Sequence, residues 1–130
     1  MQWQNIIDFG LVVLIWIVQL VIYPSFKYYQ EEDLRVWHSK YTGLVTLVVL
    51  PLMFGQVIIY GLTLWEGFET IAVIQSVLVI GTWLVTFLKA VPLHNHIQDG
   101  RDVKKSIRLL IQWNWTRTFL WSVIFILNAF

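Results

Sequence analysis

The residues best suited to chemistry lie in one polar stretch of an apolar segment near the C-terminus. Residues 109–130 contain a single charge, Arg117, and an arginine among hydrocarbon needs polar partners, water or a ligand. Helical spacing places Asn114, Arg117 and Trp121 on one face, with Trp113 four residues before the arginine. Indole rings one turn before and after a guanidinium attract it through their π faces. This pattern predicts a site for an anionic or carbonyl-bearing molecule, in which these residues bind the ligand.

Two other interpretations of Arg117 stay open. The arginine could join helices as a staple by donating to backbone carbonyls, or it could reach to the headgroups. Protein acceptors are few, because Asp8 is the only acidic residue inside an apolar segment and is expected near the outer end of its helix. Other candidates are Gln19, Gln56, Asn114 and the carbonyl that Pro51 frees.

The three histidines, His38, His94 and His96, fall on one side of the predicted topology. Imidazole suits general acid–base work, metal binding or haem ligation, and it also forms ordinary hydrogen bonds to backbone or headgroups. His94 and His96 point in different directions if they are helical and to one side if they are extended. We predict His38 and His94 as catalytic proton acceptors, no metal site, and no cofactor, with a b-type haem as the alternative.

Four long apolar segments predict an all-α integral membrane protein: residues 6–23, 42–65, 70–88 and 109–130. A helix of about 20 residues crosses a hydrocarbon core of about 30 Å, so each segment can span. Eight of the nine lysines and arginines lie in the connections after the first and third segments. Cationic connections stay on the cytoplasmic side, which predicts an antiparallel four-helix transmembrane bundle with both termini outside.

Composition supports a membrane protein and excludes several other classes. Only 13% of residues are charged, against about 25% in soluble domains. The absence of cysteine excludes disulfides and thiolate sites, and a net charge of +1 gives no reason to expect nucleic-acid binding. We expect one domain over residues 1–130, located in the bacterial inner membrane as a multi-pass protein. Its expected partners are lipid, a lipophilic small molecule, and a second copy or a larger membrane complex.

The connections are expected to differ in length. Residues 66–69 form a tight turn, whereas Pro24 to Tyr41 is expected to lie along the membrane surface and Pro92 to Ser106 to form a polar loop. Aromatic residues near segment ends are expected to be interfacial anchors: Trp3, Tyr23, Tyr41, Trp65 and Trp83. Pro51 is expected to kink the second helix.

Motifs along the chain resemble those of small bacterial four-helix membrane proteins of unassigned function. These motifs are Tyr23-Pro24-x-Phe26, His38, Pro51-Leu52-Met53, Val91-Pro92-Leu93-His94-Asn95 and Asn114-Trp115-x-Arg117-Thr118-x-x-Trp121. The last two are distantly similar to the anthrone oxygenase-like family, which oxidises polycyclic phenolic anthrones with dioxygen and no evident cofactor. That family has Pro-x-Asn after its third helix and a histidine three residues before the arginine. Here the asparagine is shifted to Asn95 by His94, and Asn114 replaces the histidine.

The resulting hypothesis is a membrane protein with a polar pocket, open toward the cytoplasmic face, that binds and oxidises a lipophilic aromatic or quinone-like molecule. Asn95 joins the expected binding residues through the resemblance. The alternatives are a non-catalytic structural or accessory membrane subunit and a b-type haem carrier.

Overall fold

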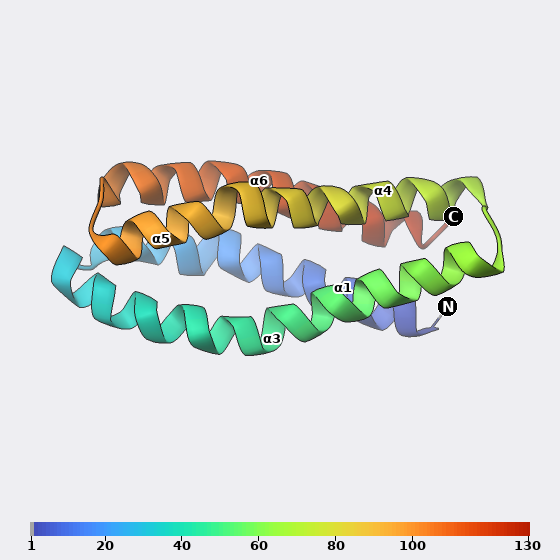
Figure 1. Cartoon of the computed structure of the whole chain (residues 1–130), viewed down its shortest axis with the longest axis horizontal. Helices are drawn as coiled ribbons and strands as arrows, with labels where there is room; N and C mark the ends of the chain where they lie inside the picture. The colour runs from blue at the N-terminus through green and yellow to red at the C-terminus, as the bar shows by residue number, and fades with distance from the viewer. Residues whose placement is uncertain (1) are drawn as a thin grey trace.

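The chain is helical throughout, and the computed structural model describes residues 2–130 with no strand among them. Two π-helical segments and one 3-10 turn interrupt the α-helices. The elements in order are α1 (Gln2–Ile17), η1 (Val18–Ile22), α2 (Tyr23–Ser25), η2 (Phe26–Tyr28), α3 (Glu31–Glu66), α4 (Thr70–Val85), η3 (Thr86–Ala90), α5 (Val91–Asp99) and α6 (Val103–Leu127). Because η1 and η3 continue the helices on either side of them, the elements form four long rods (Figure 1).

Each rod lies between two others. The helix α1 packs against α3 and α6, and α4 packs against the same two helices. Figure 1 shows both termini and the α3–α4 turn at one end, and the links into α3 and α6 at the other. The link into α6 turns at Gly100, whose φ of 72° is left-handed and suits glycine.

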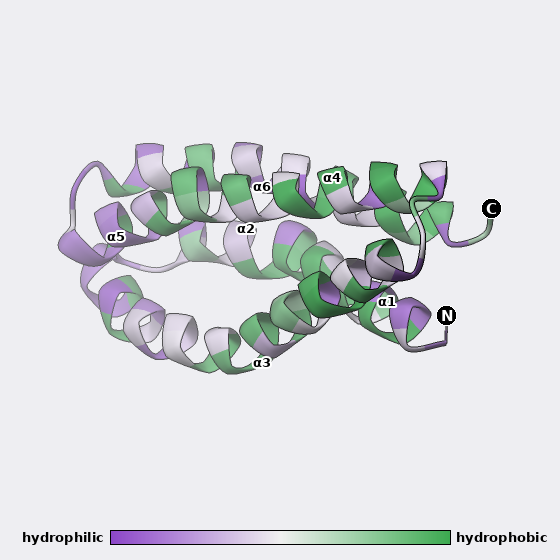
Figure 2. Cartoon of the chain, turned by 45° about the vertical axis from the view of Figure 1, so that its right-hand side comes forward, coloured by the Kyte–Doolittle hydropathy of each residue, from purple (hydrophilic) through white to green (hydrophobic). Residues whose placement is uncertain are grey.

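Three of the rods are long and apolar enough to cross a membrane: residues 2–28, 31–66 and 70–99. The fourth rod, α6, was expected to span as well, but among the described residues it is less apolar than the other three and does not count as a candidate span. Its polar stretch around Arg117 lowers its hydropathy. Large apolar side chains such as Leu47 lie on the outside, while polar ones such as Gln19 and Gln56 are buried. Figure 2 shows hydrophilic residues gathered around α5 and the link into α6.

Both π-segments lie just before a proline. The Tyr23 N–H donates to the Val18 carbonyl, and the Val91 N–H donates to the Thr86 carbonyl, each five residues back. A proline in a helix clashes with the carbonyl four residues earlier, and a wider turn relieves the clash. The helices therefore continue through Pro24 and Pro92 instead of ending there.

The predicted surface segment, residues 24–41, and the predicted polar loop, residues 92–106, are thus both wrong over most of their length. Residues 31–41 form the first part of α3 rather than a surface segment, and residues 92–99 belong to α5 rather than to a loop. Hydropathy locates the part of a helix that lies in hydrocarbon, and these helices extend beyond that part. α3 runs without a break through Pro51 and is bowed along its length (Figures 1 and 2).

Candidate functional site

Arg117 is buried inside the bundle and has few interactions with other protein groups. Its side chain is 6% exposed, and its guanidinium lies 5.1 Å from the ring centre of Trp121. Among residues 2–130, no acidic side chain pairs with it, and its Nε is buried without a hydrogen-bond partner. Cation–π attraction contributes about 2 kcal/mol at best, whereas an arginine at the centre of a spanning helix costs about 2.5–3.5 kcal/mol.

The acceptors expected for Arg117 bind elsewhere. Asn114 donates to the Gln19 Oε1 at 2.7 Å, and its own Oδ1 has no partner in the described structure. Gln56 accepts from the Trp121 Nε1 at 3.0 Å and donates to Asp8 at 2.6 Å. The staple interpretation therefore gains no support from Gln19, Gln56 or Asn114.

Of the two indoles expected beside Arg117, the structure brings only Trp121 to it. Trp113 is 36% exposed, and the Lys89 ammonium lies 4.7 Å from its ring centre. The shared face predicted for Asn114, Arg117 and Trp121 is present, since all three are buried.

Both predicted catalytic histidines lie next to one another. His38 Nε2 is 2.8 Å from His94 Nδ1, and their rings stack with centres 5.1 Å apart. His94 Nε2 lies 3.0 Å from the Tyr23 hydroxyl, and His38 Nδ1 lies 2.9 Å from Gln98 Oε1. The result is a hydrogen-bonded chain from Tyr23 through both imidazoles to Gln98.

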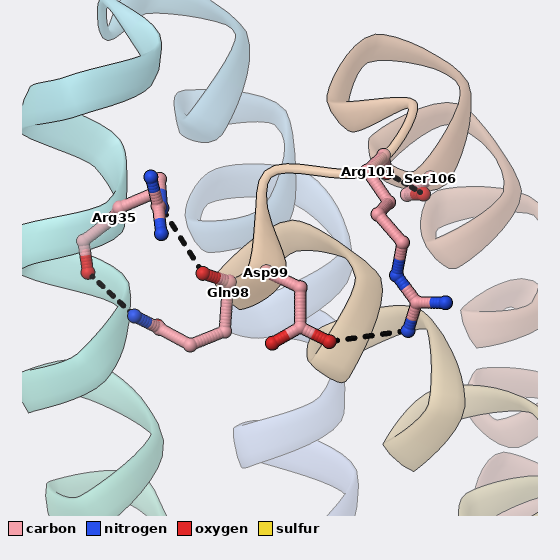
Figure 3. Close-up of polar contacts among 5 residues, drawn as sticks. All are labelled: Arg35, Gln98, Asp99, Arg101 and Ser106. Carbon is pink, nitrogen blue, oxygen red and sulfur yellow. Dashed lines mark hydrogen bonds and ion pairs between the residues drawn. The ribbon is translucent and has the colours of Figure 1, made fainter.

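The partners of Gln98 give this chain a direction. Gln98 Nε2 donates to the backbone carbonyl of Arg35 at 3.3 Å, and the Arg35 Nε donates to the backbone carbonyl of Gln98 at 3.0 Å (Figure 3). Gln98 Oε1 therefore faces His38 and can only accept, so the proton is on His38 Nδ1. With both rings neutral, His94 Nδ1 donates to His38, and His94 Nε2 accepts the Tyr23 proton.

The turn between α5 and α6, next to the hydrogen-bonded residues, has polar contacts of its own. Arg101 pairs with Asp99 at 3.1 Å, and the Ser106 hydroxyl donates to the Arg101 carbonyl at 3.3 Å (Figure 3). These contacts hold the turn between α5 and α6, and so fix the end of α5 that presents Gln98.

Arg117 and the hydrogen-bonded histidines line the same cavity, which has a volume of about 340 Å³. Arg117, Trp121, Tyr23, His38 and His94 line it together with Asn95 and Gln98, while most of the remaining wall is apolar. Arg117 also interacts electrostatically with the Tyr23 hydroxyl. Of the predicted binding residues, Trp113 and Asn114 lie outside this wall.

The cavity opens on the outer surface of the bundle. The exposed members of its wall include Thr46 on α3, Phe87 on η3, and Val91 and Asn95 on α5. These residues occupy the seam between α3 and the α4–α5 rod.

A second polar cluster lies at the other end of the bundle, around Asp8. The carboxylate is 1% exposed and accepts from Gln56 at 2.6 Å, Tyr60 at 2.7 Å and Asn128 at 2.8 Å. The amide orientations are fixed, because Gln56 accepts from Trp121 and Asn128 accepts from Gln75 at 2.7 Å. The donors all point at Asp8, which suits an ionised carboxylate.

The two histidines do not fit a bis-imidazole haem as they stand. Axial nitrogens on opposite sides of an iron lie about 4 Å apart, at about 2 Å from the metal, whereas the facing nitrogens here are 2.8 Å apart. Their other nitrogens contact Tyr23 and Gln98. His96 does not join this chain in the described structure, and the part that the structure describes contains no group of three metal-ligating side chains.

Sequence reasoning missed Tyr23, Tyr41 and Gln98. The two tyrosines were expected to be interfacial anchors, but they are 3% and 6% exposed and line the cavity. A tyrosine at the end of a long apolar run has the pattern of an interfacial anchor, and Gln98 has no distinguishing pattern, so the sequence carried no signal that places these residues in the cavity.

Comparison of this chain with protein-family models, with curated proteins and with solved structures gives no match.

Proposed function

We propose that the chain is a multi-pass protein of the bacterial inner membrane, with four antiparallel spans and both termini outside. The helix α6 packs between α1 and α4, which supports placing it at the same depth as these two apolar rods. Eight of the nine cationic residues lie on the side of the links into α3 and α6, and such residues remain in the cytoplasm.

This orientation predicts which introduced cysteines a membrane-impermeant thiol reagent will reach. The chain contains no cysteine, so each variant carries a single reactive thiol. Glu69→Cys should be labelled in intact spheroplasts, and Lys105→Cys only after the membrane is opened. The reverse order of labelling would show the opposite orientation.

We further propose that the cavity binds a lipophilic aromatic or quinone-like molecule through an anionic or carbonyl oxygen. The observation that carries this proposal is Arg117, a buried cation on the cavity wall that has no acidic partner in the described structure and whose Nε lacks an acceptor there. A ligand oxygen would supply the missing charge-assisted hydrogen bonds. The cavity, at about 340 Å³, lies at the small end of the range for ligand sites, about 300–1,000 Å³.

The hydrogen-bonded chain supports an acid–base role for the same site. A phenol-like ligand transfers its proton to Tyr23 as Tyr23 passes its own proton to His94 Nε2. His94 then releases its Nδ1 proton to His38, where Gln98 stabilises the imidazolium. Arg117 stabilises the anion left on the ligand.

The resemblance to anthrone oxygenases extends this role to oxidation by dioxygen. An anthrone-type CH₂ group and one O₂ give a C=O group and one water, with electrons passing from the ionised ring to oxygen. The protein's part is to form and hold the anion, and no further oxidant is required.

Closing the mouth of the cavity tests the proposal. Thr46→Trp should weaken the binding of a hydroxyanthraquinone at least about tenfold, because the new ring fills the rim. Tryptophan fluorescence of the purified protein reports binding, and oxygen uptake with anthrone reports turnover. The matched control is Leu47→Trp, one residue along α3 and facing lipid at 72% exposure, which should behave as the wild type does.

A second variant separates binding from turnover. His94→Phe keeps Arg117 and the cavity but removes the proton acceptor, so it should retain binding and lose oxygen uptake. Unchanged uptake in this variant would rule out the proton path. If neither ligand bound to the wild type, the non-catalytic membrane subunit would be the better account.

A further inference from the structure

The wall between α3 and α4 has a second hollow, of about 600 Å³, on the same seam as the cavity. Its lining is almost wholly apolar and comes from residues on both helices, including Val57, Gly61, Ser76, Ile80 and Leu84. Most of these side chains face outward, so the hollow is an open groove along the surface that faces lipid. We call it the outer groove.

The outer groove and the cavity meet at Phe87, which lines both. Phe87 stacks on Trp83 with ring centres 5.5 Å apart, and Trp83 meets Phe54 edge-on at 5.2 Å. Phe54, Trp83 and Phe87 thus form a continuous aromatic wall between α3 and η3. This wall lines the outer groove and reaches the edge of the cavity that contains Arg117.

We infer that the ligand of the proposed site is an amphiphile, a phenol- or quinone-type ring that carries a long hydrocarbon chain, with the ring in the cavity and the chain in the outer groove. This inference rests on the proposed function, since it adds a chain to the same ligand. Its support is that the two hollows adjoin at Phe87 and differ in character: polar groups gather in the cavity, and the outer groove is lined almost wholly by apolar side chains.

The position of the rim agrees with such a ligand. A ring with a chain stays dissolved in the bilayer and approaches from the side, where Thr46, Phe87 and Val91 border the opening. The hydrocarbon chain of a ligand in the bilayer is already out of water, so binding brings it no hydrophobic gain. It gains instead from close packing against the aromatic wall. The gain is therefore modest and specific to the shape of the groove.

Gly61 allows the outer groove to be filled without disturbing the backbone. A Cβ at this position meets nothing within 4 Å, so Gly61→Phe places a ring in the groove. The matched control is Gly43→Phe on the same helix, where a Cβ also meets nothing and the site borders neither hollow. Ser76→Leu fills the groove from the α4 side if the first variant does not fold.

The experiment compares two probes in phospholipid nanodiscs: a hydroxynaphthoquinone, and the same ring bearing a decyl chain. With the wild type, the chain should strengthen binding on the order of tenfold. Gly61→Phe or Ser76→Leu should remove this gain and leave the bare ring bound as before, while Gly43→Phe should keep the gain.

The outcomes separate the two proposals. If the chain gives no gain, or if the gain survives both groove-filling variants, the outer groove holds ordinary lipid chains and the inference is wrong, while binding of the bare ring leaves the proposed function standing. If neither probe binds to the wild type, the proposed function fails and the inference fails with it.

Discussion

Arg117→Leu should give a protein that is more stable than the wild type and no longer binds its ligand. Burial of the guanidinium costs about 2.5–3.5 kcal/mol, and its cation–π contact with Trp121 returns about 2 kcal/mol. The free energy of unfolding should therefore rise by about 1 kcal/mol. Two charge-assisted hydrogen bonds to a ligand contribute about 1.5–3 kcal/mol each, so their loss should weaken binding about 100-fold or more.

The opposite signs of these two effects distinguish a binding residue from a structural one. Thermal unfolding in detergent gives the first quantity, and fluorescence titration with the hydroxyanthraquinone gives the second. Lys89→Leu is the control, because it removes the other cation that lies over a tryptophan and borders no part of the cavity. A less stable Arg117→Leu protein that still bound its ligand would make Arg117 a staple between helices.

The helical spacing predicted the buried face of α6 that holds Asn114, Arg117 and Trp121, but it wrongly placed Trp113 beside Arg117. Residues follow each other by about 100° around a helix, so Trp121 and Asn114 fall on one side of Arg117 and Trp113 falls on the other. The core lies on the side of Asn114, which leaves Trp113 at the edge, 36% exposed. Spacing by four residues identifies neighbours of Arg117, but the direction of the core decides which neighbour is buried.

The polar loop predicted after the third helix shows a different limit. Pro92 and the polar residues behind it are typical of a loop, and the structure instead continues the helix through a π-turn. That continuation gives His94 and Gln98 the one-turn spacing that lets both meet His38. Composition could predict that the histidines share one side of the membrane, whereas their contact depends on a backbone irregularity without a reliable sequence signal.

The partners of Asp8 could not be predicted either, because they come from two other helices. Gln56 and Tyr60 reach the carboxylate from α3, and Asn128 reaches it from the end of α6. Gln56 also accepts from Trp121, which contacts Arg117. The two buried charges are therefore linked through two neutral side chains rather than paired directly.

Asp8→Leu should be among the most destabilising single substitutions in the chain. It removes the acceptor of three side-chain donors, of which Gln56 and Tyr60 are buried and Asn128 is partly buried, and an unsatisfied buried donor costs about 1–3 kcal/mol. The free energy of unfolding should fall by roughly 3–5 kcal/mol, which is the range for breaking a buried ionic network. Thermal unfolding in detergent measures the change.

Asp8→Asn tests whether the charge or only the shape of the carboxylate matters. An amide offers one oxygen to these donors and turns its NH₂ toward the others, so this variant should lose about 1–3 kcal/mol. Gln4→Leu, at the partly exposed edge of the same network, should lose less than about 1 kcal/mol. Equal stability of Asp8→Leu and the wild type would mean that the donors find other partners, and that Asp8 does not organise this end of the bundle. A fall confined to stability, with ligand binding intact in the folded fraction, would assign the two clusters separate roles: Asp8 holds the helices together, and Arg117 holds what binds between them.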